Sequence, residues 1–119
     1  MIRVVHLFDV KPTVSETAFI EWLDTQLDLA ARRFGCVSRK TWALLDGFTG
    51  SYDNAKPVRD RPRYVNEAQW NDMDGPNKFR QWLTQTPDGK EFHDRWFSSI
   101  SNHTVLRYVE GWAKQEMEG

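Results

Sequence analysis

The sequence predicts an α+β fold in which one antiparallel sheet of four strands carries helices on one of its faces. Segments with the two-residue repeat of strands alternate with helical segments in the order strand, helix, strand, strand, helices, strand. The 119 residues correspond to a single domain, 1–119, with room for a real hydrophobic core. The first strand is apolar on both faces, so helices on one face leave a second apolar face to be covered.

The composition is that of a globular chain with a high aromatic content. Six Trp, seven Phe and three Tyr supply side chains that dominate protein cores, interfaces and ligand contacts alike. The net charge of -1 argues against the basic footprint of a nucleic-acid-binding protein. The basic residues Lys56, Arg59, Arg61 and Arg63 form either a solvated loop or a funnel for an anionic ligand.

Cysteine and histidine usage gives no sign of a metal site. The single Cys36 excludes an intrachain disulfide and a Cys-rich zinc cluster, and His93 and His103 lack the spacing of metal ligands.

Arg3 and His6 interrupt the apolar run that a signal peptide would need. No run reaches the roughly 18 apolar residues that span a membrane. We therefore expect a cytoplasmic protein.

Residues 2–10 form the first expected strand. Alternation along the strand places these residues on one face: Ile2, Val4, His6, Phe8 and Val10. On this apolar face His6 is either a buried imidazole with a satisfied hydrogen bond or a catalytic base. Asp9 lies on the opposite face and does not pair with it.

The first helix follows a short turn. Thr13 and Glu16 have the spacing of a capping box, and Ser15 is the alternative cap. Apolar residues then recur on one helical face: Phe19, Trp22, Leu23, Leu27, Ala30 and Phe34. Gly35, which can adopt a left-handed conformation, is expected to end this helix.

The second expected strand, 36–45, is joined to the third by a long connection, 46–62. The connection is rich in glycine and proline and has no sustained repeat of either kind. Connections of this length in compact domains are usually functional or mobile. We expect a long hairpin connection that acts as a lid, with Phe48 and Tyr52 at its tip.

The third expected strand, 64–70, runs directly into a helix. Its alternation places Tyr64, Asn66, Ala68 and Trp70 on one face. Asparagine is disfavoured in strands, so Asn66 is either a pocket residue or a structural amide bonded to the backbone. An amide beside an indole and a small residue is typical of a pocket wall.

Two helices and a last strand complete the chain. Asp74 or Gly75 is expected to cap the first of these helices, with Pro76 near its first position. Thr86 is expected to cap the second helix, whose apolar residues include Trp96, a candidate core residue. His93 and His103 are interpreted as surface or capping residues, and the last strand is expected to span 104–112.

This order of elements is the split βαβ arrangement of ferredoxin-like domains. Right-handed crossovers place the helices on one face of the sheet. A two-fold dimer that packs sheet against sheet would bury the other apolar face. The pattern therefore predicts a homodimer through the sheet face.

With Asn66 four residues before Trp70 at the end of the third strand, the organisation resembles the dimeric α+β barrel superfamily. The likeness covers nearly the whole chain in element order and is nearest to the antibiotic-biosynthesis monooxygenases and their haem-degrading relatives. In the cofactor-independent monooxygenases, the matching asparagine and tryptophan line a pocket and hold an oxygenated intermediate. The resemblance implies that Asn66 and Trp70 donate hydrogen bonds to a developing anion or peroxide, with no cofactor.

The resemblance also suggests roles for other residues. His6 lies near the position of a polar pocket residue on the first strand of the haem-degrading relatives. Those relatives carry a haem-ligating histidine where this chain has Arg80, so haem is not expected. The additional pocket tyrosine of the monooxygenases falls near Pro76, and Tyr64 is the candidate substitute. The candidate substrate-binding residues are Tyr64, Ala68, Phe8, Tyr108 and Trp112.

Three functions remain open at this stage. The first is a cofactor-independent monooxygenase acting on a bulky hydrophobic aromatic or polyketide-like substrate, with Asn66, Trp70 and His6 as catalytic residues. The second is a non-redox cyclase or isomerase that uses His6 and the basic connection on a polyketide-like anion. The third is a small-ligand-binding or stress-related dimer without turnover.

Overall fold

A four-stranded antiparallel sheet forms the centre of the computed structural model, which describes residues 1–111. The strands lie in the order β2-β5-β1-β6. Their bounds are β1 Ile2–Val10, β2 Cys36–Ala43, β5 Tyr64–Trp70 and β6 Ile100–Val109. The order confirms the predicted α+β, ferredoxin-like arrangement.

The first helical segment is continuous but contains a π-helical turn. It consists of α1 Glu16–Trp22, the π-helix η1 Leu23–Leu27 and α2 Asp28–Arg32. Ser15 caps it, because its hydroxyl accepts a hydrogen bond from the Ala18 backbone N–H at 3.4 Å. The alternative with Ser15 as cap is therefore confirmed over the Thr13 capping box. Gly35 follows the helix with a φ of 101°, the left-handed conformation expected of it.

The second helical segment consists of α3 Asp74–Gln85 and α4 Pro87–Ser98. Thr86 caps α4 as predicted, accepting a hydrogen bond from the Gly89 N–H at 3.0 Å. The predicted cap of α3 is wrong by one position, because the helix begins at Asp74 and Met73 occupies the cap position. The Asp72 carboxylate instead accepts a hydrogen bond from the backbone N–H of Asp74.

Strand β6 begins earlier than the sequence predicts. It pairs with β1 from Ile100 opposite Val10, and a register shift between Leu7 and Asp9 accommodates the irregular start. Asn102 has a φ of 53°, which lets the chain turn at this irregularity and continue the same ladder. The helix-to-strand connection is therefore shorter than expected.

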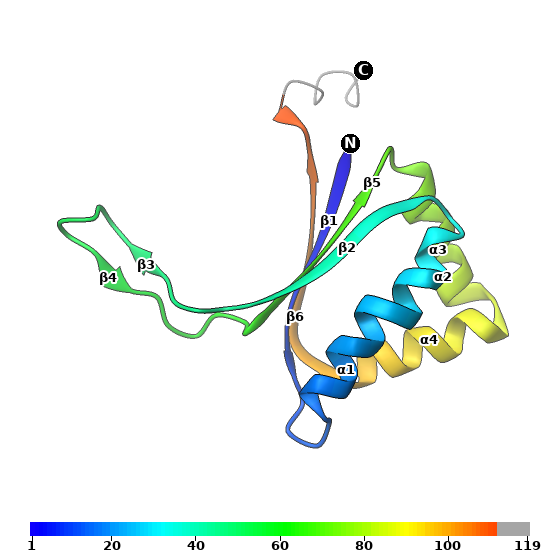
Figure 1. Ribbon diagram of the computed structural model, residues 1–119, viewed down its shortest axis with the longest axis horizontal. Helices are drawn as coiled ribbons and strands as arrows, with labels where there is room; N and C mark the ends of the chain where they lie inside the picture. Colours follow the sequence, from blue (N-terminus) through cyan, green and yellow to red (C-terminus); the bar gives the residue numbers. More distant parts are fainter. Residues whose placement is uncertain (112–119) are drawn as a thin grey trace.

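All helices lie on one side of the sheet, and the other side is bare (Figure 1). The hydrophobic core lies between the sheet and the helices, where Phe8, Leu23 and Leu27 have no exposed surface. The register places a second set of apolar residues on the bare side: Val5, Leu7, Trp42, Val65, Leu106 and Tyr108. We call this surface the open face. The sheet is therefore apolar on both of its faces, as the first strand predicted.

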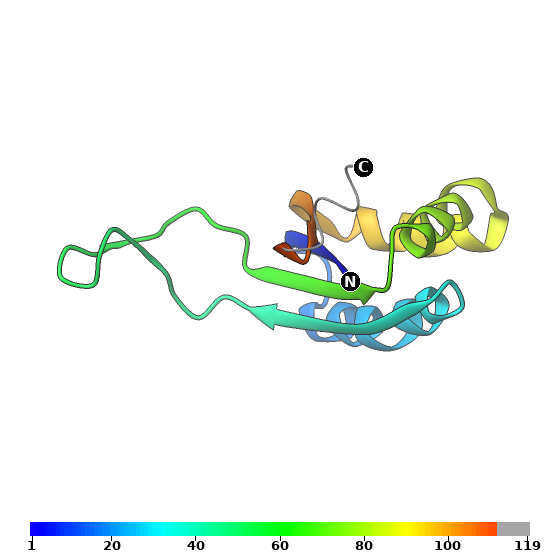
Figure 2. The ribbon, with the colours of Figure 1, turned by 90° about the horizontal axis from the view of Figure 1, so that it is seen from above.

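The long connection forms an arm that extends away from the rest of the molecule (Figures 1 and 2). Residues 44–63 make up this arm, which contains the short ladder of β3 Phe48–Thr49 and β4 Lys56–Pro57. Phe48 and Tyr52 lie at its far end with 47% and 93% of their surface exposed. The arm and the helices extend to opposite sides of the sheet, so the arm does not cover the helix-side face as a lid of this subunit would.

Candidate functional site

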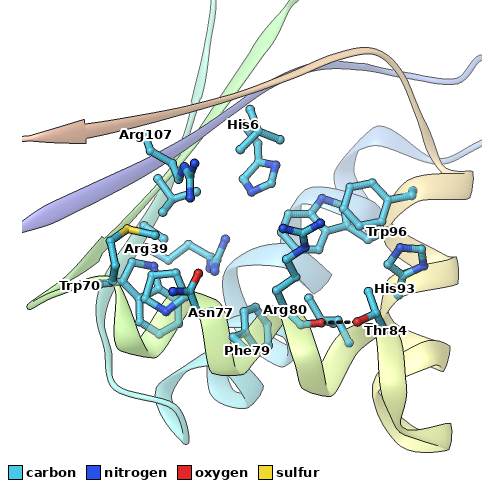
Figure 3. A pocket seen from close by; sticks show the side chains of 17 residues that line it. His6, Arg39, Trp70, Asn77, Phe79, Arg80, Thr84, His93, Trp96 and Arg107 are labelled. Carbon is cyan, nitrogen blue, oxygen red and sulfur yellow. Dashed lines mark hydrogen bonds between the residues drawn. The ribbon is translucent and has the colours of Figure 1, made fainter.

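A cavity of about 510 Å³ lies between α3, α4 and the helix side of the sheet (Figure 3). All four strands of the sheet and both of these helices contribute lining residues. Its volume lies within the range of roughly 300–1,000 Å³ that small-molecule sites occupy. Within residues 1–111 no group of His, Cys, Asp and Glu side chains could hold a metal ion. None of the helices there has the length and apolar character needed to cross a membrane.

His6 projects from the central strand β1 into this cavity (Figure 3). Its Nδ1 lies 2.8 Å from Nε2 of His103, so one of the two rings donates a hydrogen bond and the other accepts it. The ring of Trp96 lies 4.6 Å away, centroid to centroid. His103 is partly buried, so its interpretation as a surface or capping residue is wrong.

Burial keeps the His6 ring neutral. It lowers the pKa of His6 from 6.5 to about 3, with smaller contributions from the positive charge of Arg39 and from His103. Burial also lowers the pKa of His103. Both rings are therefore uncharged at pH 7. Nδ1 of His6 is engaged with His103, and Nε2 has no hydrogen-bond partner among the described residues.

Arg39 is a buried cation in the cavity wall. It lies on the edge strand β2, yet only 2% of its side chain is exposed. Its Nε lies 3.5 Å from a carboxylate oxygen of Asp28, and its Nη1 donates a hydrogen bond to the side-chain oxygen of Asn66. Burial lowers the pKa of Arg39, while Asp28 and Asp24 favour its charged form.

Asn66 lies beneath this wall. It is fully buried, is not among the cavity-lining residues, and faces His6 across the β1–β5 ladder. Its amide nitrogen donates to the Thr41 hydroxyl at 2.8 Å, while its oxygen accepts from Arg39. The amide therefore holds Arg39 rather than pointing into the cavity.

Trp70 and Ala68 line the cavity from β5, together with His6 from β1. Of the sequence-predicted site residues, these three are the ones that the structure brings together. Trp70 is held in place by the start of α3, where Gly75 packs directly against its indole ring. The wall at this point is therefore formed by the strand-to-helix junction.

The other candidate substrate-binding residues lie elsewhere. Phe8 is fully buried in the core, and the Tyr64 hydroxyl donates a hydrogen bond to Glu16, so neither lines the cavity. Tyr108 is 54% exposed on the open face, on the far side of the sheet. Trp112 lies outside the described residues. The prediction that Phe8, Tyr64 and Tyr108 line the same pocket as His6 is not met within the single subunit, because alternation or packing turns each of them away.

Among the cavity-lining residues that sequence reasoning missed are Arg39, Arg107 and Trp96. Arg39 and Arg107 each place a charge on a strand face with apolar neighbours, Val37 and Ala43 for Arg39 and Val105 and Val109 for Arg107, and that mismatch was the available signal. Trp96 is buried as predicted for a core residue, but it also lines the cavity and its indole N–H has no hydrogen-bond partner. No local sequence pattern marks this second role.

No protein-family model and no curated protein matches the sequence. Solved structures do match its fold. A hydroxynitrile lyase from Passiflora edulis has a TM-score of 0.64 and 16% identity, covering 92% of this chain and 93% of its own. A protein from Deinococcus radiodurans, provisionally described as an antibiotic biosynthesis monooxygenase, has a TM-score of 0.58 and 12% identity, covering 93% of each chain.

A third similar structure is described as a dimeric protein of unknown function with a ferredoxin-like fold, from Bacteroides fragilis. Its TM-score is 0.55 at 8% identity, and the alignment covers 92% of this chain and 95% of that one. At these identities the likeness concerns the fold alone. The comparisons thus agree with the ferredoxin-like fold that the strand order shows.

Proposed function

We propose that this chain, which has the fold of the dimeric α+β barrel superfamily, is an enzyme that removes a proton from a bound aromatic or polyketide-like substrate. One observation carries the proposal. A buried, neutral His6 lies in the cavity and is hydrogen-bonded through Nδ1 to His103. In the tautomer in which Nδ1 of His6 donates this hydrogen bond to Nε2 of His103, Nε2 of His6 carries no hydrogen and can accept a proton.

In this proposal His6 is the general base. Its Nε2 takes a proton from a hydroxyl or an acidic carbon of the substrate, and His103 holds the ring in one orientation through Nδ1. The resulting substrate anion lies near the positive charge of Arg39 in the cavity wall. A bound anion beside Arg39 offsets one of the charges that lower the pKa of His6, so the base becomes stronger when substrate is present.

The geometry favours a non-redox reaction, namely a lyase, cyclase or isomerase, after this proton transfer. The Asn66 amide, which the resemblance assigned to an oxygenated intermediate, has Arg39 and Thr41 as partners instead. Proton transfer followed by rearrangement or bond cleavage needs only the base and an anion-stabilising charge. The similarity in fold to a hydroxynitrile lyase is compatible with such chemistry.

A cofactor-independent monooxygenase is the second candidate. Trp70 lines the cavity, and its indole N–H is the donor that the resemblance assigns to an oxygenated intermediate. The anion of a substrate such as an anthrone would itself supply the four electrons that reduce dioxygen: its CH2 group becomes the second quinone carbonyl with one oxygen atom, and the other oxygen atom leaves as water. The similar Deinococcus protein, described provisionally as a monooxygenase, supports keeping this candidate.

We further propose that the protein is a homodimer that buries the open face. Trp42 and Leu106 on this surface have 51% and 39% of their surface exposed, and Val5 and Leu7 lie between them. A second copy related by two-fold symmetry covers the same apolar patch on both subunits. The Bacteroides fragilis protein with this fold is described as dimeric.

Turnover with and without oxygen tests the proposed chemistry. Substrates are a set of phenols and anthrones, followed by NMR for proton exchange and product formation and by an oxygen electrode. We expect proton exchange that persists without oxygen and is lost in His6→Gln. Turnover that stops without oxygen and falls in Trp70→Phe would establish the monooxygenase instead. Wild-type-like exchange in a folded His6→Gln protein would refute both.

A further inference from the structure

The charged residues around the cavity are all basic. These charged residues are the three arginines that line it, Arg39, Arg80 and Arg107. No aspartate or glutamate is among the lining residues. In a cavity partly shielded from water, such a one-sided set of charges attracts an anion.

Arg39 is the most deeply placed of these cations. Its Nη1 is held by Asn66 and its Nε lies beside Asp28, while Nη2 has no hydrogen bond among the described residues. Asp28 also accepts a hydrogen bond from Arg32 at 2.7 Å, so its charge is shared between two guanidinium groups. Arg39 thus keeps both a donor and part of its positive charge for a ligand.

Two further donors belong to the same cavity. Arg107 on β6 lies opposite Val4, which places it on the same sheet face as His6, and it has no salt bridge among the described residues. The indole N–H of Trp96 is buried without a hydrogen-bond partner. A buried N–H that lacks a partner costs roughly 1–3 kcal/mol, a cost that an acceptor on a ligand removes. Figure 3 shows Arg39, Arg107, His6 and Trp96 around the cavity, and the Trp96 ring lies 4.6 Å from the His6 ring, centroid to centroid.

The rest of the lining is suited to a flat apolar body. Trp70, Phe79 and Phe97 contribute aromatic surface, next to Leu83 and Val105. Aromatic rings prefer to pack against other rings with offset or edge-on geometry. A ligand that matches both the arginines and the aromatic residues of the lining has an aromatic ring system and one anionic group.

We propose that the substrate of this cavity is an aromatic carboxylate, whose carboxylate group is bound by Arg39 and Arg107 while its ring system packs against the aromatic lining. This inference rests on the proposed function and specifies its substrate class. A planar carboxylate accepts paired hydrogen bonds from guanidinium groups. Asp28 balances part of the charge on Arg39, and Arg107 has no salt bridge among the described residues, so the two arginines together keep positive charge for a carboxylate.

Binding of matched ligands tests the inference without requiring turnover. The probes are 2-naphthoate, its neutral amide 2-naphthamide, and inorganic phosphate, with affinity measured by calorimetry on the full chain. We expect naphthoate to bind at least about tenfold more tightly than the amide, as charge-assisted hydrogen bonds allow. Equal affinity for the two would overturn the inference, as would competition by phosphate at concentrations similar to those of naphthoate.

Variants separate the cavity arginines from other cations. Arg107→Gln removes one of the two positive charges that bind the carboxylate, so it is expected to remove most of the preference for naphthoate. Because the Arg107 side chain is exposed, we expect the variant to fold. Arg59→Gln changes a residue of the arm that does not line the cavity; it removes the same charge and is expected to keep the preference. If Arg59→Gln abolishes the preference and Arg107→Gln does not, the anion binds to the arm.

This experiment also separates the inference from the proposed function. His6→Gln leaves the arginines in place and should still bind naphthoate in preference to the amide. A preference for naphthoate in a protein that catalyses no proton exchange would refute the proposed function alone. Proton exchange on phenols without any preference for naphthoate would refute the carboxylate inference alone.

Discussion

Asn66 is a buried amide that holds a residue of the cavity wall without lining the cavity itself. Its oxygen accepts from Arg39 and its nitrogen donates to Thr41, so one side chain joins two positions on the neighbouring strand β2. Burying the guanidinium of Arg39 is costly unless it is paired and hydrogen-bonded. The amide and Asp28 together make that burial possible.

Replacing Asn66 should therefore be costly for stability. We expect Asn66→Ala to lower the free energy of unfolding by roughly 2–4 kcal/mol, because it leaves a buried charge and a buried hydroxyl with fewer partners. Urea unfolding followed by fluorescence measures the change. Asn71→Ala, at an exposed position after β5, is the control and should change stability little. Equal effects for the two would show that the Arg39 bond contributes nothing.

Protonation of His6 should destabilise the fold in acid. The pKa of His6 is about 3 in the folded state against 6.5 for the free side chain, so the unfolded chain binds the proton first as pH falls. Stability from this group is complete above pH 6.5 and declines between pH 6.5 and 3, by up to about 1.4 kcal/mol for each pH unit.

Comparison with a variant isolates that contribution. Urea unfolding of wild type and His6→Gln at pH 7 and pH 5 gives four free energies of unfolding. We expect the wild type to lose more stability than the variant over this interval, since glutamine does not titrate. An identical pH dependence would show that the neutral state of His6 is not enforced by the fold.

The strand-to-helix junction between β5 and α3 sets one wall of the cavity. Gly75 lies in the first turn of α3, and a Cβ atom there would approach the Trp70 ring to 2.6 Å and the Phe34 carbonyl oxygen to 2.8 Å. The backbone of the helix therefore touches the indole directly. The position of Trp70 depends on the absence of a side chain at residue 75.

Gly75→Ala should therefore destabilise the protein, although alanine favours helix. We expect a loss of roughly 1–3 kcal/mol from overpacking against Trp70, larger than the gain of about 1 kcal/mol in helix propensity. Thermal unfolding measures the loss, and binding of 2-naphthoate should weaken as Trp70 moves. Gly111→Ala, where a Cβ meets no atom within 4 Å, is the control. A stabilised Gly75→Ala would show that the junction has room to relax.

At the scale of the whole molecule, the open face is the surface through which we propose that two copies of the chain associate. We expect Leu106→Asp to convert the dimer to a monomer, because it places a charge in the apolar patch that a second copy would cover. Sedimentation velocity at micromolar concentration measures the mass. Leu29→Asp changes a residue that is 67% exposed on α2 and should leave the dimer intact. A wild-type protein that sediments as a monomer would refute the dimer.

Much of the fold could be predicted because it depends on short-range patterns. Alternation in residues 2–10 and 64–70, the helical repeat after Ser15 and the left-handed Gly35 are properties of neighbouring residues. The arm was predicted as a long hairpin connection for the same reason, but its direction was not. Direction depends on how strands twist and pair over distance, which local repeats do not encode.

The sequence by itself determined the ferredoxin-like order of elements, because hydrophobic periodicity and turn chemistry act over a few residues. It also placed His6 on one face of the first strand and Trp70 on one face of the third, without determining which face the helices cover. Only the tertiary structure decided that His6 is hydrogen-bonded to His103 and that Asn66 accepts a hydrogen bond from Arg39. It also decided that Tyr108 lies on the open face, away from the cavity. These outcomes depend on register, burial and contacts between residues far apart in the chain, which only the packed sheet and helices establish.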